Sequence, residues 1–162
     1  MLTRQQNQRL AEKEQILVPI NTGGDIRCVV AYPNRYWVAM SNLGFQTVYR
    51  LFAEHPRFAV ERAYLPENPK EPVATFESNR PISSAEILAV SVSFETDYPH
   101  VVRLLENAGV RLDSCRESGR RGFGKEAPDF RPLVIAGGAA ITLNPEPLGT
   151  GTARSASRQA IG

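Results

Sequence analysis

The sequence has little cysteine, no long apolar run and no apolar stretch near its start. Its two cysteines, Cys28 and Cys115, lie far apart without a metal-ligating neighbour at short spacing, which argues against a disulfide-stabilised scaffold. No run approaches the ~18 apolar residues needed to cross a bilayer. Residues 1–17 are polar and charged, unlike a secretory signal peptide. We therefore expect a cytoplasmic chain without a membrane partner.

The sequence also has no large excess of positive or negative charge. The chain has 19 basic and 17 acidic residues and a net charge of +2, which gives no electrostatic reason to expect a nucleic-acid partner. Basic side chains cluster in two Gly/Ser-rich stretches, which we interpret as solvated loops: Arg116, Arg120, Arg121 and Lys125, then Arg154 and Arg158. RNA contact through the first stretch is a weaker hypothesis, since only Phe123 and Phe130 lie nearby for base stacking.

The signatures of several enzyme classes are absent as well. The sequence contains no G-x-G-x-x-G after an apolar strand, no G-x-x-x-x-G-K-[ST] phosphate loop and no G-x-S-x-G nucleophile elbow. We expect a helix-end role for His55 and a surface role for His100, although Asp97 could orient the second imidazole. Cys28 is expected in the core and Cys115 in a polar loop. No residue is predicted to be catalytic or to bind a metal.

What is present is an alternation of strands and helices. Four short apolar runs rich in β-branched residues predict strands: 26–32, 58–65, 87–94 and 132–136. The second is the least apolar and suits a sheet edge, and the third suits a central place. Ser41 and Asn42 are predicted to cap a helix that ends before Pro56. Asp97 is predicted to cap a second helix that ends at Gly109. This order predicts an α/β domain with a mostly parallel sheet and helices on both faces.

Three regions follow from this pattern. Residues 1–24 form an N-terminal appendage with a short helix, residues 25–148 form the α/β domain, and residues 149–162 are predicted to be a disordered tail. Within the domain, the stretch after Tyr32 and the Gly/Arg-rich stretch 111–131 are expected to be loops.

A ligand is expected at the carboxyl ends of the strands, because open parallel sheets bind their ligands there. Asn34 and Ser93 follow two strands and carry hydrogen-bonding groups. Gly137 and Gly138 follow the fourth strand and allow a close backbone approach. The alternative is that these glycines only turn the chain and that Ser93 satisfies a local amide.

Four segments carry a family resemblance: Y-P-N-R-Y-W-V-A-M-S-N-L-G-F-Q-T-V-Y-R (32–50), E-R-A-Y-L-P (61–66), S-V-S-F-E-T-D-Y-P (91–99) and V-I-A-G-G-A-A-I-T-L-N-P-E-P-L (134–148). Together, over about residues 26–148, the chain resembles the N-terminal cobalamin (B12)-binding-like domain of a family of uncharacterised bacterial radical S-adenosylmethionine (SAM) proteins. The resemblance implies a flavodoxin-like doubly wound fold, a corrin ligand at the carboxyl edge and a following barrel with a [4Fe–4S] cluster. The family's cofactor-binding positions fall on Pro33, Asn34, Ser41, Ser93, Gly137 and Gly138.

The chain departs from that family in three ways. It lacks C-x-x-x-C-x-x-C, so the iron–sulfur cluster, S-adenosylmethionine and the radical chemistry are expected in a barrel domain supplied in cis or in trans. It lacks D-x-H-x-x-G, so cobalamin is expected to bind without a histidine ligand or not at all. After Leu148 the family's fifth strand is missing or replaced, as in a truncated or frame-shifted reading frame.

Two functions are consistent with these patterns. The first is a cobalamin-binding-like module of a radical SAM protein, without the catalytic domain. The alternative is a non-catalytic, flavodoxin-like protein-interaction module without a cofactor.

Overall fold

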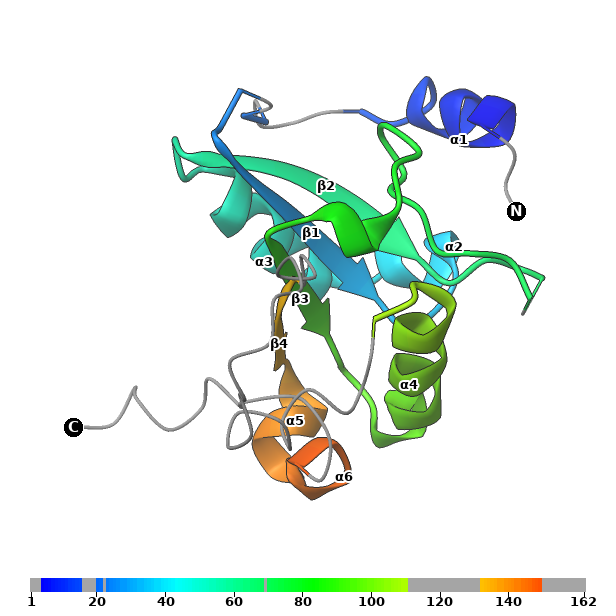
Figure 1. Cartoon of the computed structure of the whole chain (residues 1–162), viewed down its shortest axis with the longest axis vertical. Helices are drawn as coiled ribbons and strands as arrows, with labels where there is room; N and C mark the ends of the chain where they lie inside the picture. The colour runs from blue at the N-terminus through cyan, green and yellow to red at the C-terminus, as the bar shows by residue number, and fades with distance from the viewer. Residues whose placement is uncertain (1–3, 16–19, 22, 69, 111–131, 150–162) are drawn as a thin grey trace, which may run out of the picture.

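The sheet of the domain is parallel throughout. A computed structural model describes residues 4–15, 20–21, 23–68, 70–110 and 132–149. The strands β1 (Ile26–Tyr32), β2 (Phe58–Tyr64), β3 (Ile87–Ser91) and β4 (Leu133–Gly137) lie in the order β2-β1-β3-β4, and each neighbouring pair is parallel (Figure 1). The predicted α/β fold with four strands is confirmed. The predictions for 111–131 and 150–162 fall outside the described residues.

Burial on both faces explains why the central strands are apolar runs. Along β1, Val29 and Ala31 belong to one hydrophobic cluster, and Cys28, Val30 and Tyr32 belong to another. Successive strand side chains point to opposite faces, so the two clusters lie on opposite sides of the sheet. β2 is at an edge and β3 is internal, as predicted.

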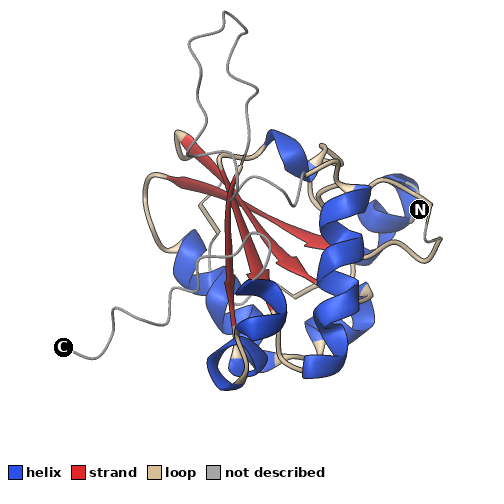
Figure 2. Ribbon diagram, turned by 60° about the horizontal axis from the view of Figure 1, so that its bottom comes forward, coloured by secondary structure: helices blue, strands red, loops and turns tan. Residues whose placement is uncertain are grey.

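Helices cover both faces of the sheet (Figure 2). α2 (Tyr36–Met40) and α3 (Leu43–Ala53) contribute buried side chains to the cluster that contains Tyr32. α4 (Tyr98–Asn107) and α5 (Ala139–Leu143) contribute to the cluster that contains Val29. The structure also contains α1 (Arg4–Ala11) and α6 (Glu146–Gly149). Within the described residues, no helix is long and apolar enough to span a membrane.

The loop predicted after Tyr32 contains α2, so that prediction is wrong. The helix has only five residues, too few to show a helical period in the sequence. Its buried residues, Tyr36 and Ala39, are three apart and face the sheet. Tyr36 stacks on Phe76 with ring centroids 5.2 Å apart. This tertiary contact with a distant segment therefore fixes the short helix.

The third strand is shorter than predicted, and Asp97 does not cap a helix through its side chain. β3 ends at Ser91, and a 3-10 turn at Glu95–Asp97 leads into α4. Asp97 precedes α4, but its carboxylate makes no capping hydrogen bond. Its Oδ1 atom instead lies 3.4 Å from the side chains of Asn34 and His100. By contrast, Asn42 caps α3 and Gly109 adopts a positive φ of 69°, both as predicted.

A buried ion pair attaches the N-terminal segment to the sheet. Arg62 of β2 is only 6% exposed. Its guanidinium donates to both carboxylate oxygens of Glu14, at 2.8 and 2.6 Å, and to Glu77 at 2.6 Å. The guanidinium carbon also lies 4.8 Å from the ring centroid of Phe76. Residues before 24 thus supply a charge that the buried arginine of the domain requires.

Candidate functional site

The carboxyl ends of β1 and β3 form the switch point of the sheet. From β1 the chain passes through α3 to β2 on one side, and from β3 it passes through α4 to β4 on the other. The loops that follow β1 and β3 therefore diverge between adjacent strands (Figure 1). In open α/β sheets this is the place where ligands bind.

Polar side chains from both loops meet at this switch point. Asn34, after β1, places its Nδ2 atom 3.4 Å from Oδ1 of Asp97, which follows β3. Asn42 donates from Nδ2 to the hydroxyl of Ser93 at 3.0 Å. Its Oδ1 accepts from the backbone N–H of Phe45 at 2.8 Å. Asn42 thus caps α3 and also joins that helix to the loop after β3.

Asp97 is the group at this edge with an unused hydrogen-bonding capacity. The residue is 3% exposed. Its Oδ1 lies 3.4 Å from Nδ1 of His100 and equally far from Asn34, both long contacts. Its Oδ2 is buried and has no hydrogen-bond partner among the described residues. A buried carboxylate oxygen without a donor is costly, so this atom is a strong acceptor for an incoming N–H or O–H group.

The two glycines at the end of β4 have different surroundings. Gly138 has a φ of 119°, and a Cβ built there would lie 2.3 Å from the carbonyl oxygen of Val92. The close approach of the chain after β3 therefore requires this glycine. A Cβ at Gly137 would meet no atom within 4 Å, so its exposed backbone leaves open space at the edge.

The other two predicted site residues are placed as follows. Pro33 is buried directly after β1. Ser41 is exposed and donates its hydroxyl to the carbonyl oxygen of Val38 at 2.9 Å, at the end of α2. No hydrogen bond within the described part of the chain joins Ser41 to Ser93. Of the sequence-based candidates, Asn34 and Ser93 therefore stand closest to the polar cluster.

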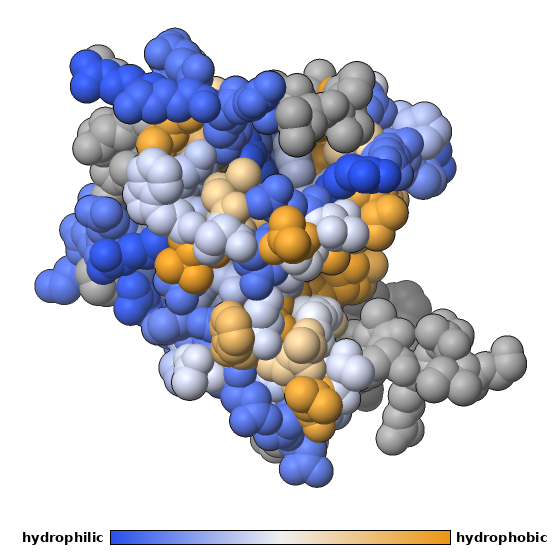
Figure 3. Space-filling model, turned by 180° about the vertical axis from the view of Figure 1, so that it is seen from behind, coloured by the Kyte–Doolittle hydropathy of each residue, from blue (hydrophilic) through white to orange (hydrophobic). Residues whose placement is uncertain are grey.

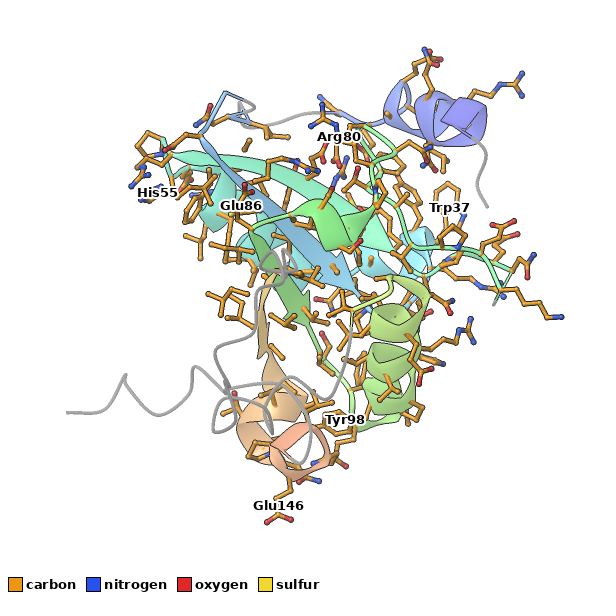
Figure 4. All side chains as sticks on the ribbon, in the orientation of Figure 1. Trp37, His55, Arg80, Glu86, Tyr98 and Glu146 are labelled. Atoms are coloured by element: carbon orange, nitrogen blue, oxygen red, sulfur yellow. The ribbon has the colours of Figure 1, made fainter. Side chains whose placement is uncertain are left out.

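A tyrosine holds the β4 side of this edge in place. The hydroxyl of Tyr98, at the start of α4, donates to the carbonyl oxygens of Ala140, at 2.9 Å, and of Asn144. Figure 4 shows Tyr98 between α4 and α5. Burial, with Glu95 as a smaller cause, raises the pKa of its hydroxyl, which therefore stays a donor at neutral pH. This contact fixes α5 beside the start of α4.

Apolar side chains are exposed next to two members of the polar cluster. Leu43 (78% exposed) directly follows Asn42, and Phe94 (60%) directly follows Ser93. A shallow pocket lies at the carboxyl end of β2 and is lined in part by Arg35, Trp37, Tyr64 and Pro66. Trp37 points outward from α2 (Figure 4). The edge thus combines hydrogen-bonding groups with exposed apolar surface.

The described residues do not fit a metal cluster. They contain no group of three His, Cys, Asp or Glu side chains that could hold a metal ion. Cys28 is buried in β1, and burial, assisted by Glu86, raises the pKa of its thiol to about 11. A [4Fe–4S] cluster is held by cysteine thiolates, and the whole chain has only two cysteines. The iron–sulfur cluster of the resembling family therefore does not fit this chain.

Two residues of the polar cluster were not predicted for this role. Asn42 was expected only as a helix cap, and Asp97 was expected as a helix cap that could also orient His100, because each directly precedes a helix. The sequence carries no signal that separates a capping carboxylate from one that faces the neighbouring loop. Their partners, Ser93 and Asn34, lie 51 and 63 residues away.

Comparison with known proteins gives one match. The family model described as "Radical SAM proteins, N-terminal" matches residues 44–150. This range contains Ser93, Asp97 and the glycine pair, whereas Asn34 and Asn42 precede it. No curated protein and no solved structure matches the chain.

Proposed function

The chain belongs to the family of N-terminal regions of radical SAM proteins, and from that premise we propose that it is a cobalamin-binding-like module. The corrin lies over the carboxyl ends of β1 and β3. The module contributes binding groups and no catalytic residue. We propose the cytoplasm as its location.

The unpaired carboxylate oxygen of Asp97 is the observation that carries this proposal. A corrin carries amide side chains around its rim. Their N–H groups can donate to Oδ2 of Asp97, which has no donor among the described residues. Asn34 and Ser93 supply further polar atoms from the two loops at the switch point. The open backbone at Gly137 admits a flat ring close to the sheet edge. These residues fit the periphery of the ligand.

The chemistry is divided between this module and a second domain. Cobalamin, when bound, supplies a cobalt centre that carries an alkyl group. The [4Fe–4S] cluster and S-adenosylmethionine belong to a radical SAM barrel that acts in cis or in trans, because the two cysteines of this chain cannot hold the cluster. Our proposal is therefore that the module positions the corrin toward that barrel.

The test is gel filtration of the purified chain after incubation with hydroxocobalamin, with visible absorbance followed in the protein peak. We expect co-elution for the wild type and about tenfold weaker binding for Asp97→Asn. Glu95→Gln is the matched control, because Glu95 is exposed and two residues away. A folded protein peak without cobalamin would overturn the proposal.

A non-catalytic interaction module is the second candidate. The exposed side chains of Leu43 and Phe94 favour it, because these apolar residues directly follow Asn42 and Ser93 of the polar cluster. A chain of this kind would elute without cobalamin, and Asp97→Asn would change no binding property. The cobalamin measurement thus separates the two functions.

A further inference from the structure

Arg62 of β2 presents two hydrogen-bonding edges to two different carboxylates. Its Nε atom donates to Glu77 at 2.6 Å, and its backbone N–H donates to the same carboxylate at 2.7 Å. The other edge, formed by the two terminal nitrogens, donates to the two oxygens of Glu14 at 2.8 and 2.6 Å. An arginine recognises a free carboxylate with this paired geometry. Glu14 therefore occupies a position at Arg62 that Glu77 does not use.

Tyr36 of α2 adds a third donor to the carboxylate of Glu14. Its hydroxyl donates to Oε1 at 2.8 Å. Burial, and after it the bond to Glu14, raises the pKa of this hydroxyl to about 12, so it stays a donor at neutral pH. Tyr36 and Arg62 are each 6% exposed. The three donors thus converge on one carboxylate in a largely buried site, where charge-assisted hydrogen bonds are strong.

Contacts within the α/β domain hold these donors in place. The ring of Tyr36 stacks on Phe76 with centroids 5.2 Å apart and meets the ring of Tyr64 edge-on at 5.4 Å. The guanidinium carbon of Arg62 lies 4.8 Å from the ring centroid of Phe76. These side chains come from α2, from β2 and from the segment that follows β2, and none comes from the N-terminal segment. The domain therefore supplies a preorganised site for a carboxylate.

The N-terminal segment, residues 4–15, contacts the domain through few side chains. Of residues 7–15, only Asn7, Leu10 and Glu14 are not exposed. Leu10 packs against the hydrophobic cluster that contains Tyr36, and Asn7 lines the shallow pocket at the carboxyl end of β2. The surface of α1 is hydrophilic (Figure 3, upper left). α1 has only eight residues, and isolated helices of this length are unstable in water, so the segment resembles a short peptide that is ordered by binding.

We propose that Arg62 and Tyr36 form a binding site for a peptide carboxylate, that Glu14 is its ligand in cis, and that a peptide supplied in trans can replace Glu14. The peptide is a short polar helix that presents a leucine and, four residues later, a glutamate, because the N-terminal segment presents this pattern in Leu10 and Glu14. Exchange removes Asn7 from the wall of the pocket at the carboxyl end of β2. The carboxylate site thus controls access to that pocket.

Rescue by a small carboxylate tests the site itself. In Glu14→Ala we expect the urea midpoint to fall and then to rise saturably with added acetate, which replaces the atoms that alanine lacks. Acetamide has the same shape without the charge and should restore nothing. Adding Tyr36→Phe should raise the half-saturating acetate concentration about three- to tenfold, because one donor is lost. Glu54→Ala is the matched control, because Glu54 pairs with an arginine at the surface. Rescue of neither glutamate variant, or of both alike, would overturn the proposal.

A labelled peptide with the sequence of residues 4–15 tests exchange in trans. The receiving chain carries Glu14→Gln, which keeps the size of the side chain and so guards against a loss of folding. By fluorescence anisotropy we expect this peptide to bind at least about tenfold more tightly than the same peptide with Glu14→Gln, because only the first supplies a carboxylate to Arg62. Equal affinities of the two peptides, or no binding of either, would contradict the exchange. Neither test uses cobalamin, so this inference and the proposed function can fail separately.

Discussion

Asn34 and Asp97 meet across the two central strands, with Nδ2 of the amide 3.4 Å from Oδ1 of the carboxylate. They come from the two loops that diverge at the switch point of the sheet. The contact leaves Oδ2 of Asp97 buried without a donor in the described part of the chain. Oδ2 of Asp97 can thus accept a hydrogen bond at the carboxyl edge of the sheet, where the fold leads us to expect a ligand.

Asp97→Asn should separate stability from binding. Loss of a buried negative charge with one unpaired oxygen should leave the free energy of unfolding unchanged or raise it by about 1 kcal/mol. Cobalamin affinity should fall about tenfold in the same variant. Urea denaturation and equilibrium binding measure the two quantities. A loss of more than about 2 kcal/mol with unchanged binding would show that the carboxylate is structural.

Gly138→Ala should destabilise the domain strongly. The positive φ of 119° and the 2.3 Å approach to the carbonyl oxygen of Val92 leave no place for a methyl group. We expect a loss of about 2–4 kcal/mol, measured by urea denaturation. Gly137→Ala is the control and should lie within about 1 kcal/mol of the wild type, because its Cβ meets open space. Equal effects would refute this distinction.

Arg62→Ala should cost about 3–5 kcal/mol, because it leaves the carboxylates of Glu14 and Glu77 without their buried partner. Arg50→Ala provides the comparison. Arg50 pairs with Glu54 at 2.7 Å, but both side chains are about half exposed, so the expected loss is at most about 1 kcal/mol. Thermal denaturation of both variants measures the difference. Similar losses in the two variants would mean that burial of the Arg62 ion pairs adds nothing to the free energy of unfolding.

The thiol of Cys28 should be unreactive in the folded protein. Burial and Glu86 raise its pKa from the ordinary value of 9.0 to about 11, so folding favours the neutral thiol. This contribution to stability is complete below pH 9 and is lost as the pH rises from 9 toward 11. Iodoacetamide labelling in a Cys115→Ser background should therefore be slow at pH 8 and fast in urea. Fast labelling without urea would contradict the burial.

Local sequence signals located most of the secondary structure. The β-branched run at Ile87–Ser91 and the capping amide of Asn42 act within a few residues, so they can be recognised without the fold. α2 could not be recognised, because five residues show no period and Phe76 holds the helix in place. The candidate site was predicted in part. Asn34 and Ser93 follow strands, but Asp97 was interpreted as a cap.

The sequence by itself determined the kinds and order of the elements, because strand and helix preferences are properties of neighbouring residues. Only the tertiary structure decided that β1 lies next to β3, that Asp97 turns toward Asn34, and that Arg62 is neutralised by Glu14. These partners are 48 or more residues apart along the chain. Their contacts depend on how whole elements pack, and no local propensity specifies that packing.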